Sequence, residues 1–195
     1  MLSFAVPSTI VIALSLATMI QGQSWKDNLS LYSNAVRVAP RNVLARNNLA
    51  TEYTSAGRYQ EASELLLSVL REQPNRWLPT YNYGFVNYRL GNLPIAEEYL
   101  ARAIRMDPGE PDQYIYLGAT YLKEGQLQPA EQLVRQGISR KPDGVGYHLV
   151  LGVIKMQQGD LVGARDAMAE ELKYHPDSAA AQAQLQAISA QLQKR

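Results

Sequence analysis

Apolar, small and helix-breaking residues recur along this chain in a pattern that repeats every 34 residues without an insertion. Four copies follow one another. We number the positions of each copy as slots 1 to 34, with slot 1 at Val43, Trp77, Pro111 and Val145. A fixed period of this length is typical of arrays of helical hairpins. The sequence therefore predicts an all-α fold without a single globular core.

The residues in the recurring slots fit a hairpin of two helices. Slots 7 and 24 carry bulky apolar or aromatic side chains, and slots 8 and 20 hold only Ala or Gly, so two helices can approach closely. Slot 15 is always Gly, which predicts the turn, and slot 32 is always Pro, which ends the second helix. The glycines are Gly57, Gly91, Gly125 and Gly159, and the prolines are Pro74, Pro108, Pro142 and Pro176.

This combination of slots, with Tyr53 and Tyr121 in slot 11, resembles the tetratricopeptide repeat (TPR) family. The resemblance implies a right-handed TPR superhelix, an α-solenoid, of four full repeats at residues 43–76, 77–110, 111–144 and 145–178. Three slots depart from the family pattern, which predicts looser packing in the fourth repeat. Slot 4 holds Arg46, Thr80, Tyr114 and His148, slot 27 holds Val69, Ala103, Gly137 and Glu171, and slot 11 holds Asn87 and Lys155 in the second and fourth repeats.

Both ends of the array are predicted to differ from the full repeats. Pro40 lies 34 residues before Pro74, so residues 23–42 form a degenerate half repeat that keeps only its second helix. After the last repeat, residues 179–195 are predicted to form a capping helix. Its apolar face is made by Leu185, Ile188 and Leu192.

The first 22 residues are predicted to form a membrane-spanning helix. The run from Leu2 to Ile20 is mostly apolar, and no charged side chain precedes Lys26. At 19 residues the run has about the length that crosses a bilayer. A buried core helix is one alternative. A cleaved signal peptide is another, but it would need a basic start and a small-residue cleavage site, which this run lacks. Since the positive charges follow the run, the positive-inside rule alone would place the repeats in the cytoplasm.

The residues after this run carry a second resemblance. The stretch from Trp25 to Tyr32 reads W-x-D-N-x-x-L-Y, and a helix, a proline and the repeats follow it. This juncture is similar to the C-terminal end of bacterial polytopic membrane proteins that resemble protein O-mannosyltransferases. In that family the last membrane helix leads into a TPR tail, generally outside the cytoplasm. The resemblance implies that the chain is membrane-bound, either as a single-pass protein or as a fragment of a polytopic one. It also implies that the repeats are extracytoplasmic and that these residues do not contain the glycosyltransferase machinery.

Composition narrows the classes of function. With 19 basic and 18 acidic side chains, the chain has no large excess of positive charge, so no nucleic-acid partner is expected. The sequence has no Cys, and no phosphate-binding loop, metal-ligand cluster or catalytic triad stands out in it. We therefore expect no enzyme activity, no cofactor, no metal and no small-molecule substrate.

The remaining candidate is a binding surface. In the TPR family, slots 2, 5, 9, 12 and 13 face a concave groove, and in the second repeat Tyr81, Phe85 and Tyr88 form an aromatic stripe at helical spacing. Such side chains either bind extended or helical segments or pack against neighbouring first helices. Slot 6 holds Asn in the first two repeats. In the TPR region of O-GlcNAc transferase, Asn side chains in this slot hold a peptide backbone. The candidate groove residues are Asn48, Leu78, Tyr81, Asn82, Phe85, Tyr88, Arg89, Ile115, Leu122, Leu149 and Met156.

The sequence therefore predicts a membrane-anchored TPR scaffold that binds a protein or peptide through its concave groove. Two alternatives stay open. The chain could be the C-terminal tail of a membrane glycosyltransferase-like protein, presenting acceptors or partners to an active site elsewhere. It could also be a structural subunit that docks into a membrane complex.

Overall fold

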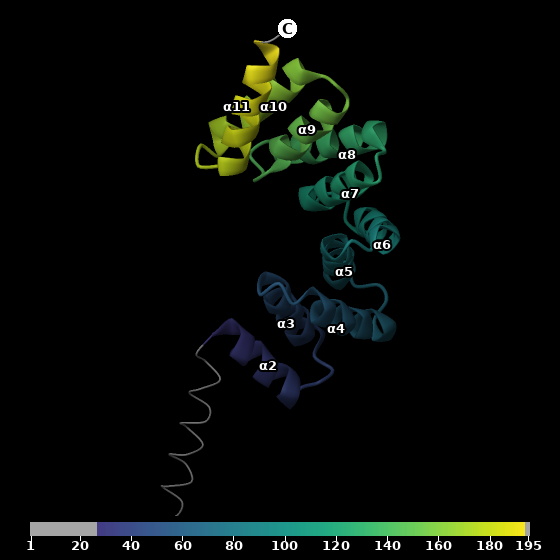
Figure 1. The fold of residues 1–195 in the computed structure, drawn as a ribbon. Helices are drawn as coiled ribbons and strands as arrows, with labels where there is room; N and C mark the ends of the chain where they lie inside the picture. The colour runs from purple at the N-terminus through teal and green to yellow at the C-terminus, as the bar shows by residue number, and fades with distance from the viewer. Residues whose placement is uncertain (1–26, 194–195) are drawn as a thin grey trace, which may run out of the picture. The chain divides into compact units, whose positions relative to one another are not determined.

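The structure is a computed structural model that describes residues 27–193 of the chain. Within these residues it contains ten α-helices and no strand, in agreement with the predicted all-α fold (Figure 1). The described residues form two compact units, which are divided between Gln73 and Pro74. The run at residues 1–22 that the sequence predicts to span a membrane lies outside the described residues. Between residues 27 and 193, no helix combines the length and the apolar character that a membrane crossing requires.

The first unit contains the half repeat and the first full repeat. Its helices are α2 (Asn28–Val38), α3 (Val43–Ser55) and α4 (Tyr59–Glu72). α2 begins at Asp27, whose carboxylate accepts a hydrogen bond from the backbone N–H of Ser30 at 2.7 Å. Such a cap satisfies one of the unpaired N–H groups at a helix start. α3 and α4 form a hairpin that turns at Gly57.

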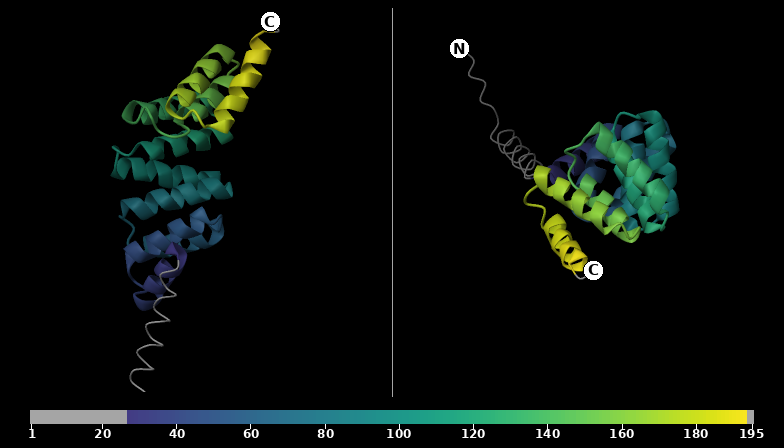
Figure 2. Two further views of the ribbon diagram at one scale, coloured as in Figure 1. Left: turned by 90° about the vertical axis from the view of Figure 1, so that its left-hand side faces the viewer. Right: turned by 90° about the horizontal axis from the view of Figure 1, so that it is seen from above.

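The second unit contains three more hairpins and a last helix. They are α5 (Trp77–Leu90) with α6 (Leu93–Met106), α7 (Pro111–Lys123) with α8 (Leu127–Arg140), α9 (Tyr147–Gln157) with α10 (Leu161–Tyr174), and α11 (Ala179–Leu192). Within this unit, consecutive hairpins lie side by side in chain order, and α11 lies against α10 (Figures 1 and 2). α11 thus occupies the range expected for the capping helix. Its Leu185 and Leu192 pack against a buried cluster that includes Met168 and Ile188.

The glycines of slot 15 have the left-handed backbone expected of the turn. Gly91 has a φ of 81° and Gly125 a φ of 75°, in a region that residues with a Cβ atom rarely adopt. Gly91 is also the C-cap of α5, with its N–H donating to the carbonyl of Tyr88 at 3.2 Å. Each hairpin therefore turns where the 34-residue period places a glycine.

The small residue in slot 8 lets the two helices of a hairpin touch. A Cβ atom on Gly84 would lie 2.9 Å from Leu100 Cγ, and one on Gly118 would lie 2.7 Å from Val134 Cγ2. Carbon atoms of separate residues do not approach so closely, so the side chain of slot 24 fills the space that a slot-8 side chain would need. The slot-24 side chains Leu66, Leu100, Val134 and Met168 are all fully buried.

The unusual residues of slot 4 have matching partners in slot 30 of the same hairpin. In the first repeat Arg46, only 5% exposed, donates hydrogen bonds to both carboxylate oxygens of Glu72, at 2.9 and 2.7 Å. In the third repeat the Arg140 guanidinium lies 4.1 Å from the ring centroid of Tyr114 and donates to its hydroxyl at 3.1 Å. In these two repeats the slot-4 side chain is therefore joined to the slot-30 side chain, which links the two helices of the hairpin.

The fourth repeat does not show the looser packing that its departures predict. The rings of His148 and Tyr174, in slots 4 and 30, stack with centroids 5.9 Å apart. Glu171 in slot 27 is 1% exposed, and its carboxylate accepts hydrogen bonds from the backbone N–H groups of Gly146 at 2.7 Å, His148 at 3.2 Å and Leu149 at 3.3 Å. A side chain of α10 thus caps the N-terminus of α9, which has no side-chain cap of its own.

Lys155, in slot 11 of the fourth repeat, ties α9 to α8 of the preceding repeat. Its ammonium nitrogen lies 2.8 Å from a carboxylate oxygen of Glu131, which also accepts hydrogen bonds from Gln158 and Arg135. Burial alone would raise the pKa of Glu131. The hydrogen bonds from Lys155, Gln158 and Arg135 outweigh burial and lower the pKa to about 2.

Replacing Gly118 with Ala is expected to lower the free energy of unfolding by about 1–3 kcal/mol, net of the roughly 1 kcal/mol that Ala contributes to a helix. The new Cβ would meet Val134 at 2.7 Å and the carbonyl oxygen of Ala130 at 3.1 Å. In a Val134→Ala background the same replacement should cost less, because the nearest methyl group is gone. Urea unfolding followed by circular dichroism measures both costs, and equal costs would contradict the fit between slots 8 and 24.

Glu131→Gln is expected to reduce the free energy of unfolding by about 1–2 kcal/mol at neutral pH. The effect is no larger because the Glu131 side chain is partly exposed and solvent weakens its ion pairs. The stabilisation from a lowered carboxyl pKa is complete above the ordinary value of 4.5 and is lost as the pH falls through about 2. In chemical unfolding experiments, the free energies of unfolding of the wild type and the variant should therefore converge as the pH falls from 4.5 to about 2.

The control for this variant is Glu98→Gln, at an exposed carboxylate of α6, which should change stability by less than about 0.5 kcal/mol. If the difference caused by Glu131→Gln stayed constant down to pH 2, the charge of Glu131 would not be what stabilises the fold.

Candidate functional site

Five aromatic side chains from α5 and α7 form one continuous cluster. Trp77, Tyr81 and Phe85 follow one another at intervals of four residues on α5, and their rings stack with centroids 6.2 and 6.5 Å apart. Tyr116 of α7 contacts α5 through three rings, with centroids 4.5 Å from Phe85, 5.9 Å from Tyr88 and 6.4 Å from Tyr81. We call Trp77, Tyr81, Phe85, Tyr88 and Tyr116 the aromatic cluster. Helical spacing places the four residues of α5 on one face, and Tyr116 joins that face to the next repeat.

The cluster lies between the core and the solvent, because all five of its side chains are half-buried. Burial raises the pKa of the Tyr81, Tyr88 and Tyr116 phenols, and for Tyr81 and Tyr116 the negative charge of Asp112 adds to the effect. These phenols are therefore protonated at neutral pH. Chemically, the cluster offers apolar ring faces together with neutral hydroxyl groups that can donate and accept hydrogen bonds.

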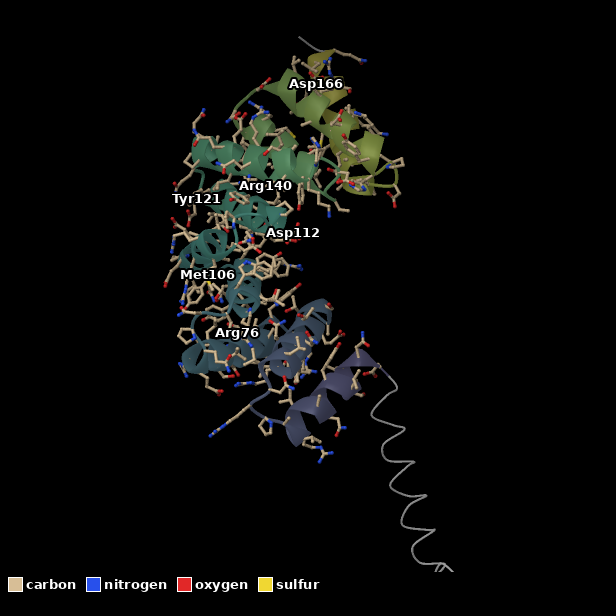
Figure 3. The ribbon with its side chains drawn as sticks, turned by 180° about the vertical axis from the view of Figure 1, so that it is seen from behind. Arg76, Met106, Asp112, Tyr121, Arg140 and Asp166 are labelled. Atoms are coloured by element: carbon tan, nitrogen blue, oxygen red, sulfur yellow. The ribbon has the colours of Figure 1, made fainter. Side chains whose placement is uncertain are left out.

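The cluster has a basic end and an acidic end. At the C-terminal ends of α5 and α7, the ammonium nitrogen of Lys123 lies 3.9 Å from the ring centroid of Tyr88 and donates to its backbone carbonyl at 3.3 Å. The guanidinium of Arg89 lies 5.9 Å from the Phe85 centroid. At the other end, Asp112 accepts a hydrogen bond from the hydroxyl of Tyr147. Figure 3 shows Asp112 and Tyr121 toward opposite ends of α7.

The predicted groove residues of the second repeat all retain exposed surface. Tyr81, Phe85 and Tyr88 belong to the aromatic cluster, Leu78 is 37% exposed, and Arg89 is exposed. Of the two slot-6 amides, Asn82 is half-buried on α5. Asn48 is half-buried on α3, which belongs to the first unit and is not placed relative to the cluster.

The predicted groove residues of the third and fourth repeats contribute mainly to packing. Ile115 is 5% exposed and lies in a buried cluster, against which Leu122 packs. Leu149 and Met156 are half-buried and pack against the buried cluster formed by α10 and α11. Ile115 therefore has almost no surface to offer a partner. The two exposed members of the predicted groove in this unit, Leu78 and Arg89, both lie on α5, whose Tyr81 and Tyr88 also pack against a buried cluster.

Sequence reasoning does not select Trp77 or Tyr116 for this surface, and it places Lys123 only in a groove-facing slot. The interval of four residues between Trp77 and Tyr81 is the signal that could have identified Trp77. Tyr116 lies in slot 6, where only the Asn residues of the first two repeats are predicted to take part, and its contacts are with a neighbouring helix. Lys123 lies in a groove-facing slot, but its position over Tyr88 is set by residues 35 positions apart in sequence.

Comparison with known proteins identifies the repeats. One sequence model described as a tetratricopeptide repeat matches residues 23–76 and 48–111, and a second with the same description matches residues 89–154. Together the matches span more than half of the chain. Among curated proteins, the protein O-mannosyl-transferase Tmtc2 of Drosophila melanogaster is 37% identical over 68 residues. That match covers 35% of this chain and 7% of the length of Tmtc2.

Solved structures of TPR proteins share the fold. TTC0263 from Thermus thermophilus superposes with a TM-score of 0.72 over 92% of this chain and 96% of its own, at 18% identity. YrrB, described as a TPR protein with an unusual peptide-binding site, superposes with a TM-score of 0.65 over 87% of this chain and 84% of its own, at 20% identity. These identities are low, so the likeness shows the fold alone. With the helical hairpins, the turn glycines and the matched family models in agreement, the chain belongs to the tetratricopeptide repeat family.

Proposed function

We propose that this TPR scaffold binds a protein or peptide partner through the aromatic cluster on α5 and α7. The observation that carries the proposal is the continuous set of half-buried rings between a basic and an acidic end. Tyr81, Tyr88 and Tyr116 pack against a buried cluster on one side, and the surface that the five rings keep exposed forms an apolar patch of the kind that marks interaction sites.

The physical case rests on what aromatic side chains contribute to binding. Tyr, Trp and Phe give a large contact area while losing little conformational freedom, and they dominate the binding energy of protein interfaces. The neutral phenols of Tyr81 and Tyr116 can hydrogen-bond to a partner's backbone without a charged group having to lose its water. The structurally similar YrrB has a peptide-binding site, which supports a peptide-like ligand here. The proposed role is non-catalytic, as is general for this fold.

We further propose that residues 1–22 anchor the chain in a membrane and that the repeats lie on the extracytoplasmic side. The support is the uncharged apolar run and the sequence juncture from Trp25 to Tyr32. A second candidate function is that of a TPR tail belonging to a larger O-mannosyltransferase-like membrane protein. The partial match to Tmtc2 favours it, and in that case the cluster would present partners to an active site elsewhere.

The binding proposal can be tested with a random dodecapeptide library displayed on phage and selected against the immobilised full chain in mild detergent. Selected peptides, synthesised with a fluorophore, should bind the wild type and lose about tenfold or more in affinity when Tyr81 and Phe85 are both replaced by Ala. Fluorescence anisotropy measures the affinity, and circular dichroism checks that the variant remains helical.

Tyr99→Ala is the matched control, because Tyr99 is a half-buried tyrosine of the same hairpin that contacts Tyr83, 4.6 Å away, rather than the cluster. Its affinity should match that of the wild type. Failure to select any peptide, or an equal loss in the Tyr99 and Tyr81/Phe85 variants, would reject the cluster as the binding site.

The predicted side of the membrane can be read with a single introduced cysteine, since the chain has no Cys. Asp166 is suitable because its side chain is 61% exposed and its ion pair is with the adjacent Arg165. In bacterial spheroplasts, Asp166→Cys should react with a membrane-impermeant maleimide before the cells are opened. Labelling that occurs only after lysis would place the repeats in the cytoplasm.

A further inference from the structure

We propose that the segment bound by the aromatic cluster carries an acidic side chain, whose carboxylate pairs with Lys123 while neighbouring apolar residues cover the rings. The inference rests on the proposed function and gives the partner a chemical class. The partner is an extended peptide segment in which apolar residues lie beside an Asp or Glu, and this acidic residue binds at the end of the cluster where α5 and α7 terminate.

The first argument is the position of the Lys123 ammonium. It is held at the rim of the cluster by two contacts with Tyr88, one to the ring face and one to the backbone carbonyl. An ammonium group has three N–H donors, and the carbonyl takes one of them. Among residues 27–193, no carboxylate forms an ion pair with Lys123. A fixed positive charge beside an apolar surface can therefore still take an anionic partner group.

The second argument is the asymmetry of charge along the cluster. Arg89, over the Phe85 ring, adds a second positive charge at the Lys123 end. The opposite end is held negative by Asp112, whose charge is felt by the phenols of Tyr81, Tyr116 and Tyr147. An acidic side chain is attracted to one end and repelled from the other, so electrostatics would fix the end of the cluster at which the acidic residue binds.

A purely structural role for Lys123 is the competing explanation. A cation at the end of a helix interacts favourably with the helix dipole, and Lys123 gives the Tyr88 carbonyl a second hydrogen bond beside the one from the Gly91 N–H. That role needs a donor but no partner anion. Lys123→Gln keeps an N–H donor and removes the charge, so it separates the two explanations.

The experiment uses the phage-displayed dodecapeptide library as its probe, selected in parallel on the full-length wild type and on variants. In the wild-type pool, Asp and Glu should be enriched beside aliphatic, aromatic or proline residues. The Lys123→Gln pool should lose this acidic enrichment while keeping the apolar residues. The Lys123→Glu pool should select Lys or Arg at the same place, because the sign of the charge at the rim is reversed.

Affinities of single peptides then give the size of the effect. Lys123→Gln should weaken a wild-type-selected peptide by roughly two- to fivefold at low salt, as expected for an exposed ion pair, and by less at high salt. Replacing the peptide's acid with its amide should give a similar loss, and the two changes together should cost little more than either alone. Lys141→Gln, at an exposed lysine that follows α8, is the control and should leave binding unchanged.

The outcomes separate the two proposals. Peptides that need Tyr81 and Phe85 but show no acidic enrichment, or that bind the Lys123→Gln variant equally well, would overturn this inference and leave the proposed function standing. A wild-type pool without enrichment of any kind, or one that is independent of the rings, would overturn both.

Discussion

The close approach of two helices at slots 8 and 24 is the constraint on which each hairpin of the second unit depends. In three successive repeats a glycine of the first helix faces a fully buried side chain of the second, and even one added carbon would overlap it. This contact sets how near the helices lie, and thereby which slots are left to face the neighbouring repeat or the solvent. The aromatic cluster exists because α5 and α7 are both held by such contacts, so that Tyr116 reaches three rings of the preceding repeat.

Around that apolar contact, the chain uses different polar or aromatic chemistry in the first, third and fourth repeats. The family position in slot 4 is replaced by an arginine that pairs with a glutamate, by a tyrosine beneath an arginine, and by a histidine stacked on a tyrosine. Because each replacement is matched within its own hairpin, the repeats are not interchangeable in their contacts even though they share one backbone plan. A slot-4 residue that departs from the family pattern is thus compensated by a contact within its own hairpin, so the departure does not disrupt the fold.

The repeat period was enough to predict the helices and their turns, because these depend on spacing alone. The exposure of individual groove residues could not be predicted in the same way. Ile115 occupies a groove-facing slot, yet it is buried because side chains such as Val134 and Tyr147 surround it. The roles of Tyr116 and Lys123 depend on contacts between helices, which no spacing within one repeat encodes. The prediction for residues 1–22 stays a prediction, since it lies outside the described residues.

The cap supplied by Glu171 has a consequence for how the chain is made. The carboxylate that completes the start of α9 lies 25 residues downstream of Gly146, on the partner helix of the same hairpin. A ribosome adds about 5–20 residues per second, so α9 emerges roughly one to five seconds before its cap exists. During that interval its first N–H groups are left to water, and the helix is supported only by its contacts with α7 and α8, which are already made. The fourth hairpin is therefore completed only when α10 emerges, with Glu171 coupling the order of synthesis to the order of folding.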